Sequence, residues 1–153
     1  MTSKLIPASV TRIARLGNHE IQPLPRDQWE AGDYVVGEVS EPPAPTAFVE
    51  LASGRLANVD VGDRIVGAFG ARFATLESTG SWEYIGDDGR MSAMTSAGLF
   101  GAVTSRSPFG LDHVQLRYIG HMISGSAKRT MSEWAVPPAD KPFATPCLLI
   151  VGS

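Results

Sequence analysis

Two arginines beside glycine-rich stretches are the residues of this sequence best suited to binding chemistry. Arg72 and Arg106 each follow a strand-interior glycine by five positions, and Thr75, Thr95 and Ser96 lie near the same stretches. Glycine lets a ligand approach the backbone closely, and paired guanidinium groups hold a carboxylate or phosphate through several hydrogen bonds. These residues therefore predict a binding site for a small anion or a contact between domains.

The same two arginines have a plainer interpretation, which is ion pairing within the domain. The acidic residues near them in the sequence are Glu77, Glu83 and Asp112. An arginine side chain serves either role, so the sequence leaves both interpretations open.

The other reactive side chains form no catalytic or metal-binding pattern. The three histidines, His19, His113 and His121, are far apart and lack the spacing of metal ligands, so we expect no metal site. Cys147 follows a proline inside an apolar run, where we expect burial to raise the pKa of the thiol and make it unreactive. No acid, base or activated nucleophile stands out, so we expect no catalytic residues.

Two aspartates occupy equivalent places after turn glycines, at Gly32-Asp33 and Gly62-Asp63. A carboxylate at such a place accepts backbone N–H groups and fixes the turn. We therefore expect Asp33 and Asp63 to be structural.

Composition limits the partners and the compartment. A chain of 153 residues fits one domain, and its net charge of −3 gives no attraction to nucleic acid or to an anionic membrane. A single cysteine forms no internal disulfide. The N-terminus lacks the apolar core of a signal peptide, and no run approaches the ~20 apolar residues of a membrane helix. We expect a cytoplasmic protein.

Glycine and proline predict the fold class. Sixteen glycines and eleven prolines are spread along the chain, which is typical of an all-β domain with many turns. Segment 32–39 recurs as 62–69, and a looser third copy spans 97–103. Glycines inside repeated strands allow the bending that closes a sheet, so we expect a small closed or nearly closed barrel.

The expected organisation is a β-barrel domain over 1–136, a proline-rich linker over 137–142 and a buried C-terminal strand within 143–153. Within the barrel we expect strands at 10–16 and 19–24, and a hairpin loop at 124–128 followed by a return strand over 129–136. Only 26–30 has helical character, and it is too short for a stable helix.

Three segments carry a resemblance to a known family: GDRIVGAFGARFAT at 62–75, TSAGLFG at 95–101 and LLIVGS at 148–153. Together they resemble the N-terminal part of bacterial P-loop ATP-binding proteins of poorly defined role, in which a β-barrel domain precedes a nucleotide-binding domain. The resemblance implies that Gly152 and Ser153 begin a phosphate-binding loop. No Gly-Lys-Ser/Thr follows Gly152, so ATP and Mg²⁺ are implied only for a missing C-terminal domain, and no cofactor is implied for this chain.

Three hypotheses for function follow. The first is a non-catalytic accessory domain of a P-loop nucleotide-binding protein, which provides substrate binding, subunit contact or regulation. The second is a self-contained barrel that binds a small anion through Arg72 and Arg106. The third, ranked last, is a small stand-alone enzyme. The apolar run 148–151 also predicts a homo-oligomer, because an unpaired apolar edge recruits another chain.

Overall fold

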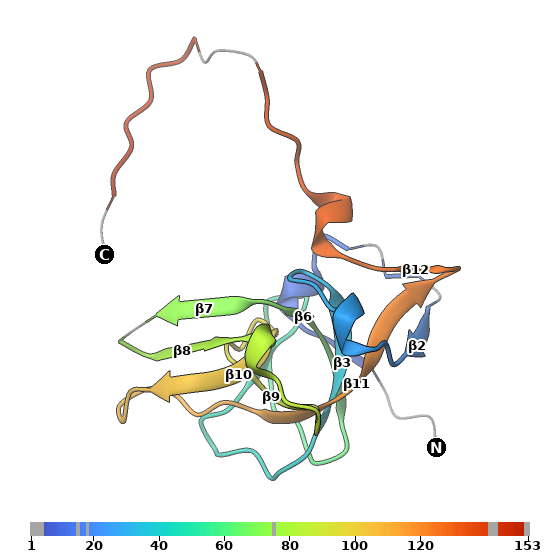
Figure 1. Ribbon diagram of the computed structural model, residues 1–153. Coiled ribbons are helices and arrows are strands. Elements are labelled where there is room, and N and C mark those ends of the chain that lie inside the picture. The colour runs from blue at the N-terminus through green and yellow to red at the C-terminus, as the bar shows by residue number, and fades with distance from the viewer. Residues whose placement is uncertain (1–4, 15, 18, 75, 141–143, 152–153) are drawn as a thin grey trace.

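The computed structural model describes residues 5–14, 16–17, 19–74, 76–140 and 144–151 (Figure 1). These residues form strands and single-turn 3-10 helices, and no α-helix. The strands are β1 (Leu5–Pro7), β2 (Glu20–Gln22), β3 (Tyr34–Val39), β4 (Val49–Glu50), β5 (Leu56–Ala57), β6 (Arg64–Phe69), β7 (Ala71–Ala74), β8 (Ser78–Ser81), β9 (Arg90–Ala93), β10 (Leu99–Arg106), β11 (Gln115–Ser124) and β12 (Ala127–Lys128). The 3-10 helices are η1 (Ser9–Thr11), η2 (Arg26–Gln28), η3 (Trp82–Tyr84) and η4 (Met131–Trp134).

A nearly closed sheet is the centre of the fold. The main sheet has ten strands, eight of them in the order β1-β6-β3-β11-β9-β10-β8-β7, and an additional pairing joins β6 to β10. That pairing completes a ring of hydrogen-bonded strands through β6, β3, β11, β9 and β10. The all-β class and the nearly closed barrel predicted from the glycine pattern are therefore confirmed.

The two sequence repeats are neighbours in the ring. β3 and β6 run antiparallel, with Val36 opposite Val66 and Val35 opposite Gly67. A Cβ atom on Gly67 would lie 2.4 Å from the carbonyl oxygen of Gly98. The missing side chain thus lets the third copy of the repeat approach β6, as expected of a strand-interior glycine.

Residues of β3 pack into two hydrophobic clusters on opposite faces of the strand. Val35 and Val39 belong to the larger cluster inside the ring. Tyr34 and Val36 belong to a smaller cluster, which η4 and the N-terminal segment cover. Burial on both faces explains why this strand reads as an apolar run instead of an alternating pattern.

Several local predictions are confirmed and two are wrong. The loop at 124–128 is a tight hairpin with Ser124 opposite Ala127, and 26–30 contains only the short η2. In the described part of the predicted strand over 10–16, residues 10–14 and 16, no strand forms, because Thr11 donates to the Ala8 carbonyl in the single turn of η1. The predicted return strand over 129–136 is absent: the strand that returns is β12, which ends at Lys128, and Thr130 and Glu133 then form a capping box that starts η4.

The C-terminal segment differs most from the prediction. Residues 144–151 form no strand, the side chains of 148–151 are between 82% and 88% exposed, and Cys147 is exposed instead of buried. A buried strand needs partners at both edges and cover on both faces, and the described residues supply neither. In Figure 1 the segment stands apart from the barrel and runs down on the side of β7. Gly152 and Ser153 lie outside the described residues.

Candidate ligand-binding site

Arg72 is held in a fixed position by the hairpin of β7 and β8. It lies opposite Gly80 in the hairpin. Its Nη1 donates to the hydroxyl of Ser78 at 2.8 Å and to the carbonyl of Met94 at 2.6 Å. Its Nη2 forms an ion pair with Glu77. The side chain of Arg72 is 17% exposed and that of Glu77 is 63% exposed, so one side of the guanidinium is anchored and the other holds a surface carboxylate.

The guanidinium group lines a cavity of about 200 Å³. Its polar wall includes Arg72, Glu77, Thr95, Ser96, Asp112 and His113. Its apolar wall includes Phe48, Leu111 and Val114. The structure thus brings together three of the predicted site residues, Arg72, Thr95 and Ser96. Thr75, which was predicted with them, lies outside the described residues.

Two of these polar residues also stabilise the turn before β10. The hydroxyl of Thr95 accepts the backbone N–H of Leu99 at 3.3 Å. The backbone carbonyl of Ser96 accepts the N–H of Glu50 at 2.7 Å, and this bond does not involve the Ser96 hydroxyl. These two hydrogen bonds hold the turn so that Thr95 and Ser96 line the cavity.

Arg106 does not share this cavity. It forms an ion pair with Asp112, whose other carboxylate oxygen accepts the Thr46 hydroxyl at 3.0 Å. Arg106 lines a second cavity of about 370 Å³. Both arginines therefore make the ion pairs that the sequence offered as the alternative, Arg72 with Glu77 and Arg106 with Asp112.

His113 lines both cavities, and sequence reasoning missed it. Its Nε2 is buried and has no hydrogen-bond partner among the described residues. Burial, and then the positive charges of Arg72 and Arg106, lower the pKa of His113 below its ordinary value of 6.5. The imidazole is therefore neutral at pH 7 and presents a nitrogen that a ligand can pair. Its position directly after Asp112, a few residues beyond Arg106, was the available signal.

A second polar cluster lies inside the barrel, around Asp33. The Oδ2 atom of Asp33 accepts the backbone N–H of Glu30 at 2.8 Å, the ammonium of Lys128 at 3.0 Å and Nε2 of His121 at 3.1 Å. The Nδ1 atom of His121 is 2.6 Å from the hydroxyl of Tyr118. The turn-fixing role predicted for Asp33 is confirmed, and so is that of Asp63, which accepts the N–H of Asp60 at 2.9 Å.

The directions of these hydrogen bonds follow from the donors. The backbone N–H of Leu24 donates to the Tyr118 hydroxyl at 3.1 Å, which leaves the hydroxyl proton free to point to Nδ1 of His121, while Nε2 of the imidazole faces Asp33. Burial raises the pKa of Asp33, but hydrogen bonds from His121, Lys128 and Glu30 outweigh it and hold the pKa below its ordinary value. Asp33 is thus ionised.

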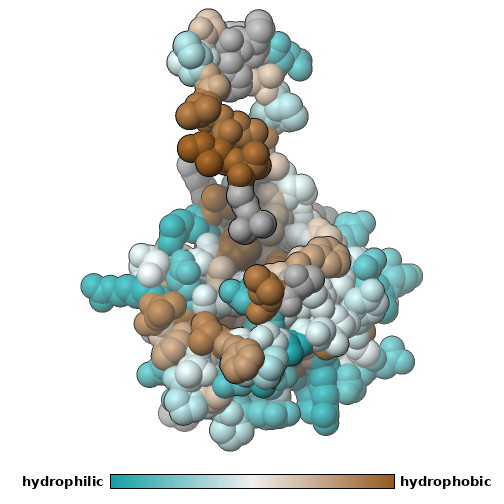
Figure 2. Space-filling view, turned by 90° about the vertical axis from the view of Figure 1, so that its left-hand side faces the viewer, coloured by the Kyte–Doolittle hydropathy of each residue, from teal (hydrophilic) through white to brown (hydrophobic). Residues whose placement is uncertain are grey.

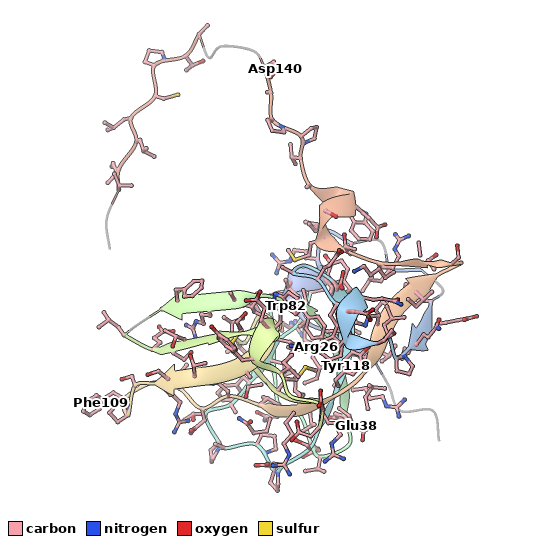
Figure 3. All side chains as sticks on the ribbon, in the orientation of Figure 1. Arg26, Glu38, Trp82, Phe109, Tyr118 and Asp140 are labelled. Atoms are coloured by element: carbon pink, nitrogen blue, oxygen red, sulfur yellow. The ribbon has the colours of Figure 1, made fainter. Side chains whose placement is uncertain are left out.

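This Asp–His–hydroxyl order occurs in nucleophilic enzymes, but here it is enclosed. The side chains of Asp33 and His121 are 0% exposed. The rings of Trp29 and Phe69 pack against the imidazole at centroid distances of 5.8 Å and 5.5 Å, and the ring of Tyr118, which is labelled in Figure 3, packs on Trp29 at 4.4 Å. A further cavity is lined by Lys128 but not by Asp33, His121 or Tyr118, so we interpret the buried pair of Asp33 and His121 as structural.

The described residues contain neither a cluster of metal ligands nor a membrane-spanning helix. No group of three or more His, Cys, Asp or Glu side chains gathers there in a way that could hold a metal ion. No helix in the same residues is long and apolar enough to cross a membrane.

Comparisons with known proteins give no family. No protein-family model matches the chain, and no curated protein or solved structure matches it significantly. The resemblance to P-loop ATP-binding proteins therefore stays a prediction.

Proposed function

We propose that this domain binds a small anion, with a carboxylate as the best fit, in the cavity lined by Arg72, and that it does not catalyse a reaction by itself. The observation that carries the proposal is the asymmetric hold on Arg72. One side of its guanidinium is fixed by Ser78 and Met94, and the other side holds the exposed Glu77.

The Glu77 carboxylate occupies the place that a ligand carboxylate would take. An exposed ion pair contributes only about 0.2–1 kcal/mol, so an incoming carboxylate can replace Glu77 at little cost. The arginine needs no reorganisation, because its other contacts stay in place. Preorganised arginines are effective carboxylate binders for this reason.

The remaining wall of the cavity favours a small ligand with a further polar group. A volume of about 200 Å³ is below the roughly 300–1,000 Å³ of sites for drug-sized molecules. Nε2 of His113 lacks a partner among the described residues, and the Thr95 and Ser96 side chains line the same wall. A small hydroxy or keto acid would pair these groups.

A titration followed by NMR tests this function. Acetate, succinate, citrate and phosphate are added at millimolar concentration, and we expect the backbone signals of β7 and of residues 95–96 to move with at least one carboxylate. Arg72→Gln should weaken that binding at least tenfold. Arg64→Gln is the matched control, because Arg64 forms a similar ion pair with Glu38 on another strand. Equal binding by both variants, or no response to any anion, would overturn the proposal.

The second role we propose is subunit contact, as expected of an accessory domain. The observation that favours it is the exposed apolar run 148–151, since four consecutive apolar side chains are stabilised by leaving water. The resemblance to P-loop proteins would assign the contact to a following nucleotide-binding domain with ATP and Mg²⁺. Reading the coding sequence beyond codon 153 tests that assignment: a Gly-Lys-Ser or Gly-Lys-Thr supports it, and any other sequence removes it.

A further inference from the structure

We propose that residues 147–151 of one copy of this chain add as a strand to the free edge of β7 in a second copy. The inference rests on the subunit-contact role proposed above and names its partner. It joins two features that are far apart in the sequence and are both without a partner in the described structure: a strand edge and an apolar segment.

The edge of β7 is open. β7 is the last strand in the sheet order and pairs only with β8 in the described part of the chain. Its outward side chains are Ala71 and the 80% exposed Phe73, while Arg72 turns inward to the cavity. Proline and outward charges, which protect many sheet edges, are absent from β7, and its one inward charge, Arg72, is already paired with Glu77.

Other edges of the sheet carry such protection. β1 ends at Pro7. β2 presents Glu20 and Gln22 to solvent and is followed by Pro23. Of these three edges, β7 is the one suited to accept another strand.

An apolar cluster extends this edge at the end of the barrel. Its members, between 69% and 97% exposed, are Phe73, Leu76, Phe109 and Leu111, which we call the hairpin-tip cluster. Phe73 belongs to β7 and the other members to two neighbouring loops, and the N–H of Ser107 in one loop donates to the carbonyl of Glu77 in the other at 2.7 Å. Phe109 projects from this end in Figure 3. Figure 2, which looks onto the same end, shows hydrophobic groups there and a larger one above in the C-terminal tail.

The C-terminal run has the properties of an added strand. Residues 147–151 are Cys-Leu-Leu-Ile-Val, without a charge, a proline or a glycine. Segments of this kind pair readily with an open edge, through backbone hydrogen bonds and alternate side chains. On β7, alternate residues of the run would cover Phe73 and its neighbours in the hairpin-tip cluster.

The linker favours a second copy over the run's own barrel. Four prolines lie in the twelve positions 135–146, namely Pro137, Pro138, Pro142 and Pro146. Proline-rich linkers are stiff and favour extended conformations, which disfavours a tight return of the run onto the sheet of its own barrel. In Figure 1 the described residues 144–151 stand apart from that sheet. If each of two copies adds its run to β7 of the other, both β7 edges are paired and the assembly is a closed dimer.

Cys147 makes the proposal directly testable, because it is the only cysteine in the chain and is exposed. An affinity-tagged double variant, Ala71→Cys with Cys147→Ser, is mixed with the untagged wild-type chain and oxidised. We expect a disulfide-linked heterodimer on a non-reducing gel. The matched control places the new thiol on another edge, as Glu20→Cys with Cys147→Ser, and should cross-link at least tenfold less.

Two further measurements complete the test. Wild-type protein should sediment as a dimer and Ile150→Lys as a monomer with an unchanged melting temperature. A monomeric wild type, equal cross-linking at both edges, or a fast-migrating monomeric disulfide in Ala71→Cys with native Cys147 would overturn the proposal; the last result would place the run on its own barrel. Ile150→Lys should keep anion binding in the Arg72 cavity, so failure of the dimer and failure of the ligand site are distinguishable.

Discussion

The Nε2 atom of His121 lies 3.1 Å from Oδ2 of Asp33, although 88 positions separate the two residues in the chain. The contact fastens β11 to the turn that precedes β3, and Lys128 completes it from the following β12 at 3.0 Å. Because the carboxylate is buried and ionised, each of these donors stabilises a charge that water cannot reach. The cluster therefore fixes how β3, β11 and β12 pair.

Asp33→Asn should lower the free energy of unfolding by about 3 kcal/mol. This is the lower end of the range for removing one partner of a buried charge pair, because Lys128 keeps Glu30 as a second partner. Urea denaturation measures the change. Asp63→Asn is the matched control at the equivalent turn of the other repeat, where one backbone hydrogen bond is at stake, and should cost about 1 kcal/mol. Equal losses would contradict a special role for the Asp33 cluster.

Stability should fall as the pH drops below about 6.5. The folded state holds the pKa of His113 below the ordinary 6.5 through burial and the charges of Arg72 and Arg106. The unfolded state therefore binds more protons below pH 6.5, and protons favour unfolding there. Unfolding measured between about pH 5 and pH 7 should show a shallower slope in His113→Gln.

His19 is the natural comparison for that pH effect, since burial, followed by the charge of Arg129, lowers its pKa as well. His19→Gln should remove a separate part of the slope, and the double variant should remove both. An unchanged slope in His113→Gln would show that His113 titrates as in the unfolded chain.

Glu77→Gln should strengthen binding of a carboxylate in the Arg72 cavity. The substitution removes the competing charge from Nη2 of Arg72 and keeps the side-chain size. An exposed pair worth about 0.2–1 kcal/mol corresponds to a gain of up to about fivefold, measurable by calorimetry. Glu38→Gln, which breaks the Arg64 pair, should leave the affinity unchanged. Weaker binding in Glu77→Gln would mean that Glu77 contacts the ligand.

Gly67→Ala should destabilise the barrel where the repeats meet. The new methyl group would lie 2.4 Å from the Gly98 carbonyl and 2.4 Å from the Phe100 ring, so β6 and the segment before β10 must separate. Overpacking of this kind costs about 1–3 kcal/mol, which a thermal melt detects. Gly17→Ala is the control, because nothing lies within 4 Å of its added Cβ. A neutral Gly67→Ala would contradict the close approach.

Local features of this fold were predictable from the sequence, because local chemistry determines them. The repeated Gly-Asp turns and the two-residue hairpin after Ser124 depend on residues near one another in the chain. The all-β class followed from the spacing of glycine and proline.

Pairings between distant segments were not predictable, because many registers satisfy the same apolar pattern. His121 gave no sign that it faces Asp33. Equal spacing after glycine suggested that Arg72 and Arg106 meet, but Arg72 turns inward to Met94 while Arg106 pairs with Asp112 over another cavity. The apolar run at the C-terminus was predicted to be buried because its side chains are hydrophobic. Hydrophobicity alone does not identify the surface against which a segment packs.

The parallel pairing of β6 with β10 has a kinetic consequence. Leu99 and Phe100 reach Ala68 and Phe69 only across the intervening β7, β8 and β9, so the ring closes through a long loop. Hairpins such as β7–β8 form within about 1–10 μs, whereas domains dominated by non-local strand pairing fold in milliseconds to seconds. During that delay β6 has an open edge, and a refolding chain at high concentration is exposed to capture by the apolar tails of its neighbours.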